Sequence, residues 1–78
     1  MVEVAHMATI KVKIYPDLEN AMTVEVSTTV VKDILEFLKD SLNLRGQYAL
    51  VKNSRILSSD ESVSSGDEVV LIPVVEGG

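Results

Sequence analysis

The stretch Met22–Asn43, MTVEVSTTVVKDILEFLKDSLN, decides the fold because its hydrophobic period changes part-way along. At its start Met22, Val24 and Val26 alternate with polar residues, the pattern of a strand that is buried on one face. Further on, apolar residues recur every three or four positions, which is the period of an amphipathic helix. The predicted apolar stripe of this helix consists of Val31, Ile34, Leu35, Leu38 and Leu42.

The ends of this helix also carry sequence signals. Thr29 is the expected N-cap, because its hydroxyl can accept a hydrogen bond from a free amide of the first turn. At the other end, either Asn43 or Gly46 can supply the left-handed residue that terminates the helix.

Upstream of this stretch, a second alternating segment predicts another strand. In Thr9–Tyr15, Ile10, Val12 and Ile14 are expected to face inward. The segment Pro16–Asn20, PDLEN, has the composition of a turn. The two strands are therefore predicted to form a hairpin.

Three further strands are predicted after the helix. Tyr48–Lys52 and Arg55–Leu57 are short candidates joined by a two-residue turn, and Ser58–Asp67 is a polar connection. The last candidate, Glu68–Val75, is almost continuously apolar. Such a strand is either covered on both faces or leaves one apolar face exposed.

This order of elements favours an α+β fold of the β-grasp type. We expect a mixed sheet of four to five strands, with the helix packed across one face and the first and last strands adjacent in the middle. The β-grasp domain is expected to span residues 8–74. Residues 1–7 are expected to be an N-terminal extension without a function of its own, in which His6 is solvated. A tag remnant or an alternative start at Met7 is as consistent with the sequence as a native extension of the first strand. Residues 75–78 are expected to form a flexible tail.

Composition limits the possible functions. A chain of 78 residues holds one core, and 46% hydrophobic residues without a long apolar run indicate a globular protein rather than a membrane-spanning one. The net charge of −5 argues against binding to nucleic acid. No membrane partner is expected either. No signal peptide is visible, so we expect a cytoplasmic protein.

The side chains needed for catalysis are scarce. The chain has one histidine, close to its start, and no cysteine, which argues against an enzyme. Asp60, Glu61 and Glu68 form an acidic group that we expect to be ordinary solvated surface. No metal site and no tightly bound cofactor are predicted.

The chemically suggestive feature is the end of the chain, Gly77-Gly78, which an apolar strand containing Pro73 reaches almost directly. Two glycines remove every side chain from the last two residues, so the terminal carboxylate can thread a narrow channel in a partner. The segment Val75–Gly78 would reach about 13 Å beyond the sheet when extended.

Two motifs resemble those of the ubiquitin-like sulfur carriers of the MoaD/ThiS type. These motifs are the hairpin VKNSRIL and the ending GDEVVLIPVVEGG. The resemblance is closest to the MoaD group, the small subunits of molybdopterin synthases, because Pro73 is present, although Val74 replaces the second proline of that group. The positions that match the ending are Gly66, Asp67, Glu68, Val69, Pro73, Val75, Gly77 and Gly78.

The resemblance implies a cycle in which the protein is a substrate rather than a catalyst. A MoeB/ThiF-like adenylating enzyme would use ATP to activate the carboxylate of Gly78, and a sulfurtransferase or another sulfur donor would then convert it to a thiocarboxylate. A MoaE-like large subunit would receive the tail and use the sulfur for molybdopterin synthesis. The inserted residues would be Val75, Glu76, Gly77 and Gly78.

The last strand also predicts a surface for these partners. If Glu68 points to solvent, alternation places Val70, Ile72 and Val74 on the same outer face, and Val69, Leu71 and Pro73 toward the helix. The positions of partner-binding residues in the family add Tyr15 and Ile56. The predicted partner-binding patch is Tyr15, Ile56, Val70, Ile72 and Val74.

Other functions remain open at the level of sequence. The same fold and tail would serve a ubiquitin-like modifier that is joined through Gly78 to lysines of other proteins, or a sulfur carrier for thiamine synthesis or tRNA thiolation. A β-grasp domain that only binds its partner, without using the two glycines, is a third class.

Overall fold

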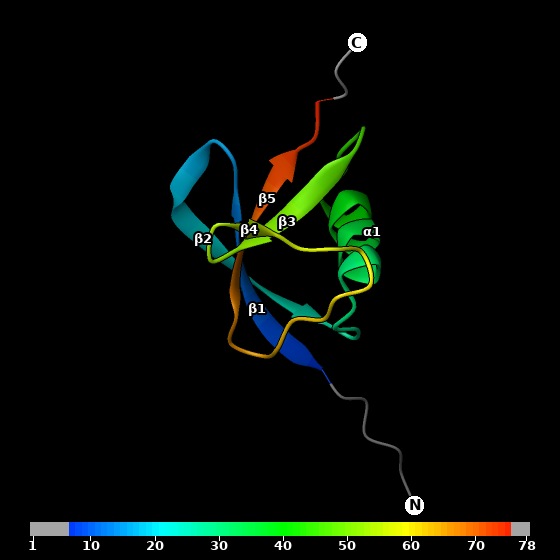
Figure 1. The fold of residues 1–78 in the computed structure, drawn as a ribbon. Helices are drawn as coiled ribbons and strands as arrows, with labels where there is room; N and C mark the ends of the chain where they lie inside the picture. Colours follow the sequence, from blue (N-terminus) through cyan, green and yellow to red (C-terminus); the bar gives the residue numbers. More distant parts are fainter. Residues whose placement is uncertain (1–6, 76–78) are drawn as a thin grey trace, which may run out of the picture.

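A computed structural model describes residues 7–75 and confirms the predicted order of strands and helix (Figure 1). The elements are β1 (Ala8–Ile14), β2 (Asp17–Val26), α1 (Val31–Leu42), β3 (Tyr48–Lys52), β4 (Arg55–Ile56) and β5 (Glu68–Pro73). The predictions for His6, Glu76, Gly77 and Gly78 concern positions outside the described residues. The division into a domain at 8–74 and a tail at 75–78 stays a prediction.

The strands form one mixed sheet in the order β2-β1-β5-β3-β4. β1 and β5 lie side by side in the middle and run parallel, while the other pairs are antiparallel. The helix α1 covers one face of this sheet (Figure 1). This arrangement is the predicted β-grasp fold, with five strands.

The core lies between α1 and the helix-facing side of the sheet. Val31, Ile34 and Leu38 of α1 are at most 1% exposed, which confirms the predicted stripe, and Leu35 and Leu42 pack partly buried beside them. Burial of each large aliphatic side chain contributes about 1.5–3 kcal/mol. The sheet supplies the other fully buried side chains, namely Ile10, Val12, Val26, Leu50, Val69 and Leu71.

The predicted N-cap is wrong. No side chain caps α1, and the N-cap position is the valine that follows Thr29. The free amides of the first turn are instead bound by a distant loop. Val31 N donates to the carbonyl of Glu61 (2.8 Å), and Lys32 N donates to that of Ser59 (3.0 Å). Because these acceptors are backbone atoms some 30 residues away, nothing in the local sequence could identify them.

The C-terminal end of α1 agrees with the first of the two alternatives. Asn43 is the C-cap and adopts the left-handed conformation, with φ of 56°. The amide of Leu44 then donates to the carbonyl of Lys39 (2.9 Å), which satisfies one of the last free carbonyls of the helix. Gly46, also at positive φ, lies further along the connection to β3.

The turn of the first hairpin is tighter than predicted. Asp17 already pairs with Ile14, so most of the segment expected to form the turn belongs to β2. The next pair is Lys13 with Ala21, and the additional residues on β2 form a bulge. The Asp17 carboxylate accepts hydrogen bonds inside this bulge from the amide of Glu19 (3.2 Å) and from Asn20 Nδ2 (3.2 Å).

Met22, Val24 and Val26 of β2 were predicted to face inward, but the core shields only the residues toward the end of the strand. Val26 is buried and Val24 is half-buried, but Met22 is 39% exposed. The tip of the β1–β2 hairpin lies well away from α1 (Figure 1), and the exposure of Met22 shows that the core does not enclose this side chain. Alternation identifies the face of a residue, but it does not reveal how far the covering layer reaches.

Candidate functional site

The last strand crosses the middle of the sheet and separates the core from an outer apolar face. Val69 and Leu71 are completely buried, whereas Val70 and Ile72 are half-exposed on the opposite face. The predicted parity is confirmed for these four residues. Pro73, predicted to point toward the helix, is exposed at the end of the strand.

The pairing of β5 with its neighbours gathers an apolar surface on the outer face. Val70 pairs with Lys13 and Val51, and Ile72 pairs with Ala49. Val51 in turn pairs with Ile56, which is 61% exposed on β4. We call this surface the outer patch; its residues are Tyr15, Ala49, Val51, Ile56, Val70 and Ile72.

The outer patch contains four of the five residues predicted for partner binding. Tyr15 is 54% exposed and follows β1, where its amide donates to the carbonyl of Leu71 (3.0 Å). Val74 lies just beyond β5 and is 42% exposed. Sequence reasoning missed Ala49, which pairs with Ile72, and Val51, which lies between Val70 of β5 and Ile56 of β4. Their spacing around the buried Leu50 was the available signal, because they alternate with it along β3.

An apolar groove of about 310 Å³ lies where the chain leaves the sheet. It is lined by Tyr15, Ile72, Pro73 and Val75, and Val75 is 86% exposed. The final described backbone contact is Val74 N donating to the carbonyl of Gln47 (2.8 Å), which extends the β3–β5 ladder by one residue. The predicted tail therefore begins beside an apolar depression that is continuous with the outer patch.

Lys13, which pairs with Val70 of the outer patch, forms an ion pair with Glu68. Lys13 Nζ lies 2.8 Å from Glu68 Oε2, at the start of β5. The Lys13 ammonium lowers the pKa of Glu68 through this hydrogen bond and through its charge. The six residues of the outer patch carry no charge, as expected for the centre of an interface.

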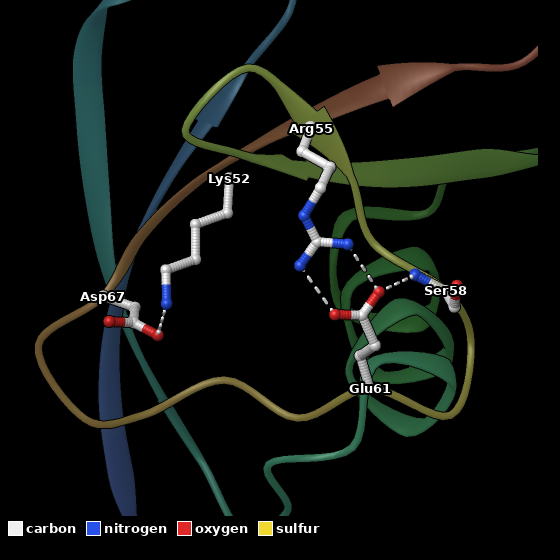
Figure 2. A network of polar contacts seen from close by, with 5 residues as sticks. All are labelled: Lys52, Arg55, Ser58, Glu61 and Asp67. Carbon is white, nitrogen blue, oxygen red and sulfur yellow. Dashed lines mark hydrogen bonds and ion pairs between the residues drawn. The ribbon is translucent and has the colours of Figure 1, made fainter.

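A second set of polar contacts fixes the loop between β4 and β5 (Figure 2). Arg55 binds Glu61 through its two terminal guanidinium nitrogens, Nη1 at 3.0 Å and Nη2 at 2.8 Å. The amide of Ser58 donates to the same carboxylate (2.8 Å). The Arg55 hydrogen bond, followed by that of Ser58, lowers the pKa of Glu61 to about 2.

The far end of the same loop is held by Asp67. Lys52 Nζ lies 2.8 Å from Asp67 Oδ2 (Figure 2). The amide of Ser64 donates to the same oxygen (2.7 Å). Both contacts lower the pKa of Asp67, the lysine more strongly. In addition, the amide of Lys11 donates to the carbonyl of Asp67 (2.9 Å), so this aspartate joins the loop to β1.

These contacts define the role of the acidic residues that the sequence grouped together. Glu61 and Glu68 each belong to an ion pair, and Asp60 is exposed. Within residues 7–75, no three histidine, cysteine, aspartate or glutamate side chains gather in a way that could hold a metal ion. The helix found in that range is neither long nor apolar enough to span a membrane.

Comparison with known proteins identifies the family. A model described as the ThiS family matches residues 13–78, which includes β5 and the terminal glycines. The chain belongs to the ThiS family. The family assignment agrees with the broad resemblance to MoaD/ThiS-type sulfur carriers that the sequence motifs indicated. Comparison with curated proteins gives no match.

Solved structures agree with the ThiS family at the level of the fold. The ubiquitin of Caldiarchaeum subterraneum has a TM-score of 0.69 and 21% identity, covering 94% of this chain and 100% of that one. An N-terminal ubiquitin-like domain has a TM-score of 0.72 and 12% identity, covering 96% and 82%. A de novo design based on ubiquitin has a TM-score of 0.69 and 19% identity, covering 91% and 93%. The β-grasp is therefore of the ubiquitin-like type.

Membership of the ThiS family supports a small protein that is either a sulfur carrier or another ubiquitin-like protein. Proteins of this family generally act together with adenylating enzymes and with sulfur-transfer partners. The outer patch and the groove at the start of the tail are the surfaces that could contact such partners.

Proposed function

We propose that this chain is a sulfur carrier whose Gly78 carboxylate is adenylated and then converted to a thiocarboxylate. The observation that carries the proposal is the extent of the family match, which runs through the terminal glycines. In this proposal the chain is a substrate and binds no cofactor tightly. ATP is used by the adenylating enzyme.

The chemistry requires two steps because a carboxylate is a poor electrophile. The carboxylate oxygen of Gly78 first attacks the α-phosphorus of ATP, which releases pyrophosphate and leaves an acyl adenylate. A sulfur nucleophile from a donor protein then attacks the carbonyl carbon, and AMP leaves with the electrons of the broken C–O bond. When this nucleophile is a persulfide of the donor, an acyl disulfide forms, and a second thiol attacks its donor-side sulfur. The donor then leaves as a disulfide, and Gly78 keeps a thiocarboxylate, which is itself a sulfur nucleophile.

The outer face supports a docking role in this cycle. The outer patch is apolar and uncharged, and it leads into the groove lined by Ile72 and Pro73 next to Val75. A partner that covers both would exclude water beside the tail and hold its direction. We therefore propose Tyr15, Ile56, Val70, Ile72 and Val74 as contacts of the partner. The proposed inserted residues are Val75, Glu76, Gly77 and Gly78.

Within the family we propose a place closest to the MoaD group. Pro73 supports this choice, because it matches the proline of the MoaD ending. The proposed partners are a MoeB/ThiF-like adenylating enzyme, a sulfurtransferase or other sulfur donor, and a MoaE-like large subunit that uses the sulfur for molybdopterin synthesis. Binding of purified MoaE-like and thiamine-pathway partners in parallel would distinguish this role from thiamine synthesis.

The experiment that tests the carrier chemistry is intact-mass spectrometry. The full chain would be incubated with ATP, an adenylating enzyme of known activity and a sulfide source, alongside a variant that lacks Gly78. We expect a mass gain equal to the exchange of one oxygen for one sulfur, in the full chain only. An unchanged mass with an enzyme that demonstrably adenylates the chain would contradict the proposal.

A protein modifier is the second candidate, favoured by the structural likeness to a ubiquitin. In that role the activated Gly78 carbonyl would be attacked by a lysine amine of another protein, and an isopeptide bond would form. Covalent conjugates in cell extract that disappear when Gly78 is deleted would support the modifier. A stable thiocarboxylate without such conjugates would support the carrier.

A further inference from the structure

The groove at the start of the tail is built from three separate segments of the chain. Because β1 and β5 run parallel, they end on the same side of the sheet, where Tyr15 follows β1 and Val75 lies two residues past β5. The amide of Tyr15 donates to the carbonyl of Leu71 (3.0 Å), which fixes Tyr15 beside β5. Ile72 and Pro73 of β5 line the groove between them.

Val75 lies one residue past the last described hydrogen bond of the sheet. In that bond the amide of Val74 donates to the carbonyl of Gln47 (2.8 Å). The side chain of Val75 is 86% exposed, against 54% for Tyr15 on the opposite wall. A side chain bound between these two residues would therefore add a contact at the point from which the tail leaves the sheet.

The lining of the groove selects an apolar occupant. The hydroxyl of Tyr15 is the only polar group among the four side chains that line it. Lys13, two positions before Tyr15, is paired with Glu68 at 2.8 Å. Two positions after Tyr15, the Asp17 carboxylate accepts a hydrogen bond from Asn20 Nδ2 (3.2 Å). A charged group in the groove would lose water without gaining an ionic partner from the residues that line it.

The size of the groove suits one large side chain. Its volume of about 310 Å³ stands at the lower end of the range for small-molecule pockets, and only four residues line it. Aromatic anchors in pockets of this kind carry much of the binding energy of an interface. Ile72 belongs to both the groove and the outer patch, so a partner docked on the patch can place such a side chain in the groove.

We propose that the adenylating enzyme inserts one large apolar side chain into this groove, between Tyr15 and Val75. The inference rests on the proposed function, because it requires an adenylating enzyme that acts on Gly78. Tyr15 is anchored to β5, so an inserted side chain that contacts it also fixes Val75 and thereby directs the tail. Tyr15 and Val75 are then positioning residues for the terminal carboxylate, whereas Ile56, on the far side of the outer patch, contributes to docking alone.

Single-turnover adenylation separates docking from positioning. The measured quantity is the rate constant of pyrophosphate release at increasing concentrations of an adenylating enzyme of known activity, in excess over the full chain. Ile56→Ser should raise the half-saturating enzyme concentration about three- to tenfold and leave the maximal rate constant unchanged. Tyr15→Ser and Val75→Ser should each lower the maximal rate constant by about fivefold or more.

A double-mutant cycle tests whether the two positioning residues act together. Because both act through one inserted side chain, the variant with Tyr15→Ser and Val75→Ser should be no slower than the slower single variant. Tyr15→Phe keeps the apolar wall and should retain the original rate constant. Phe37→Ser removes an aromatic side chain of similar exposure, 42%, from α1 and should change neither quantity.

Several outcomes would overturn the proposal. These are additive losses in the double variant, unchanged maximal rate constants in both single variants, or an equal loss in Phe37→Ser. Self-association of the free chain that Tyr15→Ser abolishes, measured by sedimentation, would also overturn it, because a second copy would then occupy the groove. If the enzyme did not adenylate the original chain, the proposed function itself would fail, which is a result distinct from all of these.

Discussion

Ser54 has a backbone conformation that suits glycine better than serine. It occupies the second central position of the two-residue turn between β3 and β4, with φ of 65°, after Asn53 at φ of 54°. Turns of this kind favour Asn-Gly, because positive φ costs a side-chain-bearing residue about 1–2 kcal/mol. Ser54→Gly should therefore raise the free energy of unfolding by about 0.5–1 kcal/mol, after the greater entropy of glycine in the unfolded chain is subtracted. Urea denaturation measures this difference.

Asn53→Gly is the matched control for this substitution. Asparagine tolerates the left-handed region better than serine does, so the control should stabilise the protein less. A Ser54→Gly protein that is less stable than the original would show that the serine side chain contributes more than its backbone strain costs.

Ile72 is the residue at which the proposed partner surface can be tested directly. It is half-exposed on the outer face and lines the groove at the start of the tail. Ile72→Lys should leave the fold largely intact, because the new ammonium can reach water. It should weaken binding to an adenylating enzyme by more than about tenfold, as expected for a charge placed in an apolar contact. Calorimetric titration with the purified enzyme gives the affinity.

Ser41→Lys adds the same charge on the exposed side of α1, away from the outer patch. This control should bind the enzyme almost as well as the original chain. Comparable losses in both variants would indicate a general charge effect and would remove Ile72 from the proposed interface.

Within α1, replacing a side chain by alanine should affect the free energy of unfolding very differently on the two sides of the helix. Leu38 is 1% exposed, whereas its neighbour Phe37 is 42% exposed. Leu38→Ala should lower the free energy of unfolding by about 2–5 kcal/mol, because it leaves a cavity in the core. Phe37→Ala should lower it by less than about 1 kcal/mol. Urea denaturation of both variants tests the pair, and similar losses would contradict the assigned helix face.

Sequence reasoning predicted the elements well where the signal was periodic. The stripe of α1 and the alternation of β5 repeat over enough residues for their buried faces to be identified. The start of α1 was predicted wrongly because its first amides bind carbonyls of Glu61 and Ser59 in a distant loop. Met22 was placed by parity on the same face as the buried Val12, with which it pairs, but the core does not enclose it. How far the core extends depends on other elements.

The candidate site was predictable to a similar extent. Strand parity located Val70 and Ile72 on the outer face, and the resemblance supplied Tyr15 and Ile56. Ala49 and Val51 were not proposed, since their place in the outer patch depends on the β3–β5 register. The pairing of Glu61 with Arg55 was equally hidden, because it depends on how the loop turns back toward β4.

At the scale of the whole molecule, carboxylates join segments that are distant in sequence. Asp67 connects the loop to β1 and β3, Glu68 connects β5 to β1, and Glu61 holds the loop that covers the start of α1. The pKa of each of these groups is lowered by its partners. The folded protein therefore binds protons more weakly at these sites than the unfolded chain does.

The sign of the resulting pH dependence follows from that difference. Glu61 has a pKa of about 2 in the folded protein against an ordinary value of 4.5, so its contribution to stability is complete above about pH 4.5. The contribution is lost progressively as the pH falls toward 2, because the unfolded chain then takes up the proton first. We expect the free energy of unfolding to decrease over this window, and urea denaturation between about pH 6 and about pH 2 measures it.

Glu61→Gln tests whether this carboxylate accounts for a substantial part of the acid sensitivity. The glutamine cannot titrate, so the variant should be less stable near neutral pH and should lose less stability across the acid window. Arg55→Gln should also reduce the loss of stability across this pH range, because removal of the guanidinium raises the pKa of Glu61 toward its ordinary value. If both variants lost stability with acid as steeply as the original chain, the loop would be held by its backbone contacts with α1 and β1 rather than by this ion pair.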